Sequence, residues 1–307
     1  MIKLRKEVFQ IIFVQVIFPI LLVFSAGYLL QRRMKLDIRV VSTVAMYIFM
    51  PCLIFRTFYH TNLDLQYVYM LLFFIMLFVL LILISKIYVS IKGLPKHYES
   101  AYILSTAFMN TGNYGSPIIL LAYGTIGFNY AISFFVIQSI SMHTVGIYYA
   151  SRGKLKMKDA IKKIYEMPMI YAVATVILLK TLHIKTPDNL LTVIDLLASA
   201  CIPTVMIILG MQLAEIKLND FEWGSITYST IVRLVVSPVI AYLLTLVFPF
   251  DPLLAKVLIL SSAMPSAVVA AMYAVQFDAK SELVSSTTII NTLASIGTIT
   301  LLLYMLG

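Results

Sequence analysis

The chain has 307 residues, of which 61% are hydrophobic and only 12% are charged, and its mean hydropathy is +0.95. Water-soluble proteins carry about 25% charged residues, so this composition excludes a soluble globular protein and predicts an all-α polytopic membrane protein. The net charge of +9 is then a signal of membrane orientation, and we expect no nucleic-acid partner.

Ten apolar segments of a length suited to helical spans follow one another along the chain. They cover residues 8–30, 38–58, 67–91, 99–123, 128–149, 168–184, 190–214, 225–248, 253–277 and 283–306. The first is longer than the apolar core of a signal peptide and no small-residue cleavage site follows it, so we expect it to be a span. The most polar segment, residues 151–166, is a predicted cytoplasmic linker between two five-helix repeats, residues 1–150 and 167–307.

The two halves show the same arrangement of prolines. Pro51 and Pro117 lie in the second and fourth segments, and Pro203 and Pro265 lie in the corresponding segments of the second half. Because five crossings is an odd number, a duplicated half runs through the membrane in the opposite sense to its twin. We therefore predict a 5+5 inverted repeat, in which broken helices 4 and 9 cross near the membrane midplane.

Basic residues gather at alternate connections. Lys and Arg are frequent after the first, third and fifth segments and scarce after the second and fourth. The positive-inside rule then places both termini outside the cytoplasm, although residues 3, 5 and 6 are also basic.

The fourth segment contains residues that membrane helices avoid. It lies in an uncharged run, residues 100–151, yet it holds Asn110, Gly112, Asn113, Gly115 and Pro117. Unpaired backbone groups in hydrocarbon cost several kcal/mol each, so a break persists there only where protein or a water-filled cavity covers it. Carriers place their substrates at breaks of this kind. A kinked span with a packing defect or a re-entrant turn is the alternative.

Two half-helices are predicted to begin at Pro117 and Pro265, because the missing N–H of proline is not needed at the first helical position. The amino end of a helix carries about half a positive charge, so two such ends facing one cavity favour an anion. Neutral polar side chains surround this point: Asn110, Thr111, Asn113, Ser116, Ser262 and Ser266. For each of them, local capping of the broken backbone is the alternative. Helix breaks or hinges are predicted at Pro51, Gly115, Pro117, Pro203 and Pro265.

Further polar residues lie at membrane depth. Gln138 and Asn291 are neutral, His143 is a candidate proton carrier with an interfacial histidine as the alternative, and Arg233 is expected to extend to the cytoplasmic face. The sequence has no nucleophile with its base, no paired acids and no zinc-ligand spacing, so we predict neither enzyme activity nor a cofactor.

Several motifs occur in an order that resembles one family. NTGNYGSP, residues 110–117, matches the pattern NTxxxGxP at every fixed position, and VIQSISMHT with Gln138, IVRLVVSPVIAY at residues 231–242 and the stretch 263–290 follow it. With these motifs the chain resembles the auxin efflux carrier family, which contains the plant PIN-FORMED auxin exporters and bacterial malate and malonate permeases.

The resemblance implies a scaffold of helices 1, 2, 6 and 7 and a transport domain of helices 3–5 and 8–10. It also implies elevator-type alternating access, a homodimer, and small organic anions as substrates. Asn110 takes the role of a carboxylate ligand, and Pro117 and Pro265 take those of crossover prolines. The substrate-binding residues are predicted to be Asn110, Thr111, Gly112, Asn113, Tyr114, Pro117, Gln138, Met264, Pro265, Ser266 and Asn291.

The sequence differs from the plant members at two places. It reads EMPMIY at residues 166–171, where those members have an Asn-rich motif, so Met169 replaces a substrate-facing Asn. The third segment lacks their pair of Asp and Lys. These differences do not favour auxin as the physiological substrate.

We therefore expect a secondary transporter of small organic anions in the lipid bilayer of a bacterial inner membrane. The candidate substrates are malate- or malonate-like carboxylates and auxin-like indole-3-acetate, and coupling to H⁺ or Na⁺ is left open. A cation-coupled symporter of bile-acid-like anions and a membrane ligand sensor that does not transport are the alternatives. Sodium dependence identifies the first, and binding without flux identifies the second.

Overall fold

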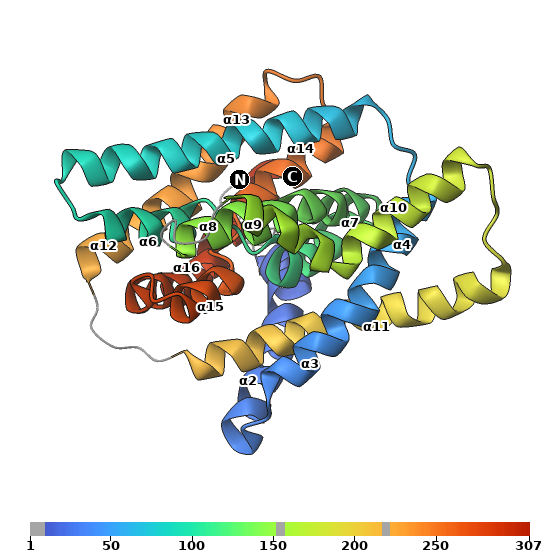
Figure 1. Ribbon diagram of the computed structural model, residues 1–307, viewed down its shortest axis with the longest axis horizontal. Helices are drawn as coiled ribbons and strands as arrows, with labels where there is room; N and C mark the ends of the chain where they lie inside the picture. Colours follow the sequence, from blue (N-terminus) through green and yellow to red (C-terminus); the bar gives the residue numbers. More distant parts are fainter. Residues whose placement is uncertain (1–9, 152–156, 217–221) are drawn as a thin grey trace.

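The computed structural model describes residues 10–151, 157–216 and 222–307, and every regular element in these ranges is a helix (Figure 1). The prediction of an all-α membrane protein is confirmed. The first two residues of the predicted first span, the basic residues 3, 5 and 6, and residues 152–156 of the predicted linker lie outside the described residues.

The helices of the first half begin near the predicted positions. Two of them start at an aspartate whose side chain accepts a hydrogen bond from the N–H two residues on, at 3.0 Å for Asp37 and 2.9 Å for Asp64. Asp251 caps a helix of the second half in the same way, at 2.9 Å. In chain order the elements are η1 (Phe13–Ile17), α2 (Phe18–Met34), α3 (Ile38–Val44), η2 (Ala45–Phe49), α4 (Met50–His60), α5 (Leu65–Ile91), α6 (Lys96–Thr106), η3 (Thr111–Gly115), α7 (Ser116–Ser141), η4 (Met142–Gly146) and α8 (Ile147–Ala150).

The second half follows after the polar segment. Its elements are α9 (Met157–Lys162), η5 (Lys163–Glu166), α10 (Pro168–Thr181), α11 (Asp188–Glu215), α12 (Trp223–Ile231), η6 (Val232–Val236), α13 (Ser237–Thr245), α14 (Pro252–Ser262), α15 (Val268–Gln276) and α16 (Ser281–Leu306).

Seven helices of the described chain are long and apolar enough to cross a membrane: Gln10–Met34, Ile38–His60, Leu65–Ile91, Thr111–Ala150, Asp188–Glu215, Trp223–Thr245 and Ser281–Leu306. An eighth is present if Lys158–Glu166 and Pro168–Thr181, which are bent by 68°, form one span. The predicted ninth span contains two shorter helices, α14 and α15, and the predicted fourth contains α6 and the beginning of the long helix Thr111–Ala150. Gly124 interrupts this long helix with φ 65° and ψ −165°.

Wide π-helical turns precede four prolines. η1, η2, η3 and η6 each end two residues before a proline: Pro19, Pro51, Pro117 and Pro238. A proline ring clashes with the carbonyl four residues back and has no N–H to donate to it, whereas a π turn shifts the bonding pattern by one residue. The helices therefore continue through these prolines. Pro203 lies inside α11 without such a turn.

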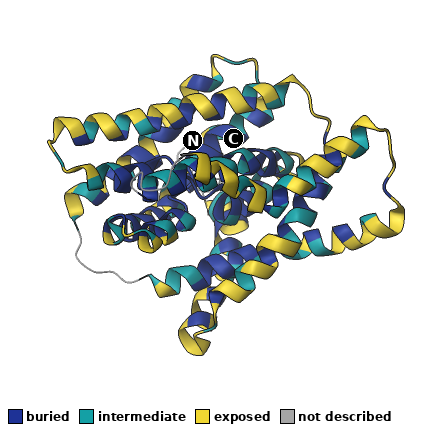
Figure 2. Cartoon of the chain, viewed as in Figure 1, coloured by how far each residue is buried: buried dark blue, intermediate teal, exposed yellow. Residues whose placement is uncertain are grey.

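Buried side chains form two hydrophobic clusters. The larger joins α5–α7 and α12–α16 with α2, and the smaller joins α3, α4, α10 and α11 with one side of α7. Exposed residues lie on the outer faces of long helices such as α5 and α11 (Figure 2). In α5 these include Leu72, Ile75 and Val79, an apolar face that suits lipid contact.

The helices α2 and α11 touch through their backbones at two glycines. A Cβ atom on Gly27 would lie 2.2 Å from the carbonyl oxygen of Ile207, and one on Gly210 would lie 2.0 Å from that of Phe24. Both glycines are therefore required for this separation of the two helices, as at other close contacts between membrane helices.

Candidate functional site

Two interruptions of the helical structure meet inside the protein. The first, Ala107–Asn110, separates α6 from η3, and the second, Ala263–Ala267, separates α14 from α15. They pair as an antiparallel bridge between Met109 and Ser266. We call this pair of interruptions the crossover.

Two backbone hydrogen bonds join the interruptions. The N–H of Asn110 donates to the carbonyl of Pro265 at 2.8 Å, and the N–H of Ala267 donates to the carbonyl of Phe108 at 2.9 Å. These bonds pair part of the backbone that the interrupted helices leave open, which is necessary where no water is present. Segments more than 150 residues apart in the sequence therefore form one unit.

The second half-helix begins later than predicted. α15 starts at Val268, and Pro265 lies within the interruption, so the prediction that Pro265 opens a helix is wrong. The reason is the bridge, because the carbonyl of Pro265 accepts from Asn110 and the backbone there is extended. Pro117 is the second residue of α7, but η3 continues the helix backward to Thr111, so this half-helix begins six residues before the predicted start.

Polar side chains surround the bridge. The Ser266 hydroxyl donates to the carbonyl of Ser105 at 2.5 Å, and Asn291 Nδ2 donates to Ser266 Oγ at 2.7 Å. The side-chain amide of Gln138 donates to the carbonyl of Met109. The structure thus brings together four predicted site residues from four different helical segments: Asn110, Gln138, Ser266 and Asn291.

Several buried polar atoms at the crossover have no hydrogen-bond partner among the described residues. They are Asn110 Nδ2, Thr111 Oγ1, Gln138 Oε1 and Asn291 Oδ1. Buried polar groups are nearly always paired, and leaving one unpaired costs about 1–3 kcal/mol. Such a cluster is expected where a ligand supplies the missing partners.

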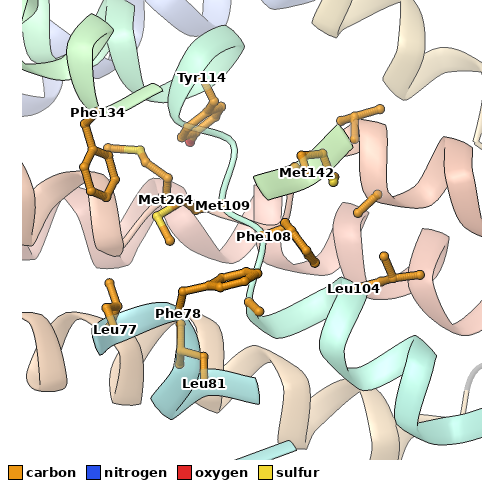
Figure 3. Packing of buried hydrophobic residues seen from close by; sticks show 14 of the residues in the cluster. Leu77, Phe78, Leu81, Leu104, Phe108, Met109, Tyr114, Phe134, Met142 and Met264 are labelled. Carbon is orange, nitrogen blue, oxygen red and sulfur yellow. The ribbon is translucent and has the colours of Figure 1, made fainter. Parts of the chain in front are cut away.

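The other predicted residues of this region have packing contacts. Tyr114 accepts a hydrogen bond from Ser295 Oγ at 2.9 Å. A Cβ atom on Gly112 would lie 2.5 Å from the ring of Phe135, and one on Gly115 would lie 2.9 Å from the side chain of Met264. Asn113 is half-buried. Figure 3 shows Tyr114, Met109 and Met264 close to the extended segment, among buried side chains of neighbouring helices.

Arg233 was not among the predicted site residues, and its expected extension to the cytoplasmic face is wrong. The side chain is fully buried. Nη1 donates to the carbonyl of Thr106 at 2.5 Å, and Nη2 donates to Ser237 Oγ and to the carbonyl of Ser262. The two carbonyls belong to the last residues of α6 and α14, so Arg233 contacts both helices that lead into the crossover.

A cavity of about 260 Å³ lies apart from these residues. It is lined by Met46, Tyr47, His143, Ile147, Lys163, Glu166, Met167, Pro168, Met169, Tyr273, Gln276 and Phe277. Of the predicted functional residues only His143 lines it, and His143 Nδ1 lies 2.8 Å from the carbonyl of Ser139. Met169, at the position where the plant members have an Asn, is also part of the wall.

The predicted hinge prolines outside the crossover lie in continuous helices. Pro51 follows η2 at the start of α4, and Pro203 lies inside α11. Within residues 10–151, 157–216 and 222–307, no group of three or more His, Cys, Asp or Glu side chains is arranged to hold a metal ion.

Comparison with known proteins identifies a family of membrane transport proteins. A family model described as "Membrane transport protein" matches residues 12–304. A protein of Rhizobium meliloti named "Putative malonate transporter" is 29% identical over 208 residues, which are 65% of each chain. A protein of Methanocaldococcus jannaschii named as an uncharacterized transporter is 29% identical over 200 residues, 63% of this chain and 64% of the relative.

A third relative, from Methanothermobacter thermautotrophicus, is also named as an uncharacterized transporter and is 25% identical over 205 residues, 67% of each chain. The first two matches span slightly less than two thirds of the relatives' length. The family model, in contrast, extends over nearly all of the sequence, from the first described span to the last. The chain therefore belongs to the membrane transport protein family, which is the auxin efflux carrier family that its motifs resemble.

Proposed function

We propose that the protein is a secondary transporter of small organic anions and that the anion binds at the crossover. The observation that supports this most is the pair of buried, unpartnered donors, Asn110 Nδ2 and the Thr111 hydroxyl, beside the place where two interrupted helices meet. Membership of a transport family supports the class of function, and the relative named as a malonate transporter supports a dicarboxylate substrate.

The proposed ligands are side-chain donors beside two helical amino ends. Asn110 Nδ2 and the Thr111 hydroxyl have no partner among the described residues and lie where η3 begins. A carboxylate accepts several hydrogen bonds at once, and bonds to an ionised acceptor are about twice as strong as neutral ones. Ser266 and Asn291 are already hydrogen-bonded to each other, so they would form the opposite side of the site.

The proposed topology remains ten spans in a 5+5 inverted repeat. α6 with η3 and the start of α7 would be the fourth span, and α14 with α15 would be the ninth. The interruption at Gly124, between the predicted fourth and fifth spans, supports this division. Both termini would then be extracytoplasmic in a bacterial inner membrane.

The proposed movement is an elevator-type displacement of a transport domain against a scaffold that also forms a homodimer. Two features support the division. The smaller hydrophobic cluster joins three of the four helices of the proposed scaffold with one side of α7, and the fourth, α2, contacts α11 through Gly27 and Gly210. The cavity lies between both groups, with Tyr47 and Pro168 on one side and Tyr273 and Gln276 on the other. Such a cavity gives the anion a route from one face of the membrane.

The test is transport of malonate, malate and indole-3-acetate by the purified protein in proteoliposomes. We expect saturable malonate or malate uptake, and we expect Asn110→Ala to weaken apparent affinity by about tenfold to a hundredfold, because a hydrogen bond to a charged ligand contributes about 1.5–3 kcal/mol.

The matched control is Asn129→Ala, which removes the same side chain from a half-buried position of α7 outside the crossover. It should transport at the wild-type rate. Equal transport by the Asn110→Ala protein would remove Asn110 from the site, and binding of malonate without flux would identify a ligand sensor instead.

A further inference from the structure

Arg233 is a buried cation that the proposed function has not used. By volume it is the largest fully buried side chain of the described residues. It lies in η6, in the middle of the long helix Trp223–Thr245. The four ion pairs of the described residues all involve other side chains, and Arg233 Nε has no partner among those residues. Charged groups in an apolar interior require compensation by charges or dipoles.

The compensation comes from two helix ends. Thr106 and Ser262 are the last residues of α6 and α14, and their carbonyls accept from the two terminal nitrogens of Arg233. Ser237 Oγ donates to the carbonyl of Ser262 at 2.8 Å and also accepts from Arg233, which fixes the guanidinium in place. The carboxyl end of each helix carries about half a negative charge, so two ends balance about one positive charge.

Carbonyls at the carboxyl ends of interrupted membrane helices are also the groups that hold coupling cations in carriers. In this protein the carbonyls of Thr106 and Ser262 are bound by a cation that is part of the chain. A free monovalent ion would compete with the guanidinium for the same oxygens. The structure therefore has the chemistry of a cation site in which the cation cannot leave.

We propose that Arg233 takes the place of a coupling cation at the crossover, so that the anion binds and moves without sodium. Arg233 is a positioning residue in this proposal: it holds the carboxyl ends of α6 and α14 together and supplies a permanent positive charge to the unit that binds the anion. The inference rests on the proposed function for the transport step only. The role of Arg233 in holding the two helix ends together does not depend on transport, and a separate experiment tests it.

The first arm measures malonate transport in proteoliposomes with Na⁺, K⁺ or N-methylglucamine as the external cation. Wild-type rates should agree within about twofold in the three media, because the positive charge is supplied by the protein. Arg233→Lys should keep sodium-independent transport, since it keeps the charge. Arg233→Gln, which keeps hydrogen-bonding capacity and loses the charge, should be slower by about tenfold or more.

The second arm uses no substrate. Thermal unfolding of the detergent-solubilised Arg233→Gln and Arg233→Ala proteins is measured with and without guanidinium or Na⁺ at concentrations of about 10 mM, well below denaturing levels. Added cation should raise the lowered melting temperature of these variants and leave the wild type unchanged. Arg56→Ala is the matched control, since Arg56 Nη1 donates to Ser199 Oγ at 3.1 Å and contacts neither helix end.

The results separate the two claims. A wild type that requires Na⁺, or an Arg233→Gln protein that transports as fast as Arg233→Lys, would overturn the proposal for the transport step. Melting temperatures of Arg233→Gln and Arg233→Ala that do not respond to small cations would overturn the cation site itself. If the wild type moves none of the anions tested, the proposed function fails, while the thermal arm still decides whether Arg233 occupies a cation site.

Discussion

Glu222 and Lys280 form a polar cluster where three helices begin. The Lys280 ammonium pairs with the Glu222 carboxylate, which also accepts from Tyr98 at 3.2 Å and from Ser225 at 3.1 Å. The Lys280 ammonium lies 3.9 Å from the centre of the Tyr98 ring. The residues come from the start of α6, the start of α12 and the residue before α16, so the cluster connects helices of both halves.

This cluster predicts a pH-dependent stability. Burial raises the pKa of Glu222, but the hydrogen bond and charge of Lys280 more than offset it, so the pKa lies below its ordinary value of 4.5. Because the folded-state pKa is depressed, the stabilisation is complete above about pH 4.5 and is lost as pH falls through the folded-state value. Burial lowers the pKa of Lys280, yet the bonds with Glu222 and Tyr98 raise it overall, so the same contribution declines only at high pH, above 10.5.

The measurement is the melting temperature of Glu222→Gln against pH. At pH 7 we expect the variant to be less stable by at most about 1 kcal/mol, because the pair is partly exposed. The difference should shrink as pH falls below 4.5 and through the depressed folded-state pKa of Glu222. Glu282→Gln, which changes an exposed acid in the first turn of α16, should follow the wild type at every pH. A constant deficit down to pH 3 would show that the charge of Glu222 is not what stabilises the cluster.

Single residues differ in how well the sequence predicts their place. Asn110 could be assigned to the crossover because helix-breaking residues around it are unusual in an uncharged run. Arg233 could not, because its position near the middle of a span says nothing about what lies opposite, and its partners Thr106 and Ser262 are distant in sequence. In the folded protein, two backbone carbonyls accept hydrogen bonds from the guanidinium of Arg233, so the side chain does not need to extend to water.

At the scale of elements, the sequence predicts that helix breaks exist better than it predicts the residues at which they begin and end. Asparagine, glycine and proline mark the first interruption, Pro265 marks the second, and the structure brings the two together. The start of the second half-helix at Val268 is not predictable from Pro265, because the extended backbone there depends on a hydrogen bond with Asn110. The ring of a proline fixes its own φ angle, but the segment that is hydrogen-bonded to it decides whether a helix follows.

The contact of α2 with α11 predicts a strong effect of adding one methyl group. Gly210→Ala would place a Cβ atom 2.0 Å from the backbone oxygen of Phe24, so the two helices must move apart. We expect a loss of about 1–3 kcal/mol, seen as a lower melting temperature in detergent. Gly297→Ala in α16 is the control, since a Cβ atom there meets no described atom within 4 Å and alanine favours the helix. Equal melting temperatures would mean that α2 and α11 separate without cost.

At the scale of the whole molecule, composition and the succession of apolar segments predict an all-α membrane protein, and the structure confirms this class. They do not distinguish spans that are single helices from spans that are divided, since hydropathy is the same in both. Segment 253–277, for example, has no charged residue after Lys256, yet it contains α14, the interruption and α15. Burial of the interruption by other helices decides the outcome.

The cavity predicts that movement between the two groups of helices is required for transport. Tyr47 and Gln276 line it from opposite sides. In a protein whose Cys52 and Cys201 are replaced by alanine, cysteines at these two positions should be joined by a cleavable bifunctional thiol reagent. We expect transport to stop after cross-linking and to return after cleavage.

The control joins Tyr47→Cys with Glu166→Cys, because Glu166 ends η5, two residues before α10, and lines the same cavity from the side of Tyr47. That cross-link should leave transport intact. Full transport by the protein cross-linked between Tyr47 and Gln276 would contradict a relative movement of the two groups.

The backbone hydrogen bonds of the crossover affect which parts of the protein can move to open its interior to one side of a membrane or the other. Breaking the hydrogen bonds from Asn110 to Pro265 and from Ala267 to Phe108 would leave two backbone donors and two backbone acceptors unpaired where no water is present. We therefore expect the two extended segments to stay paired if the protein changes conformation during transport. A substrate bound at the crossover, as proposed above, would then keep the same neighbours while other helices move.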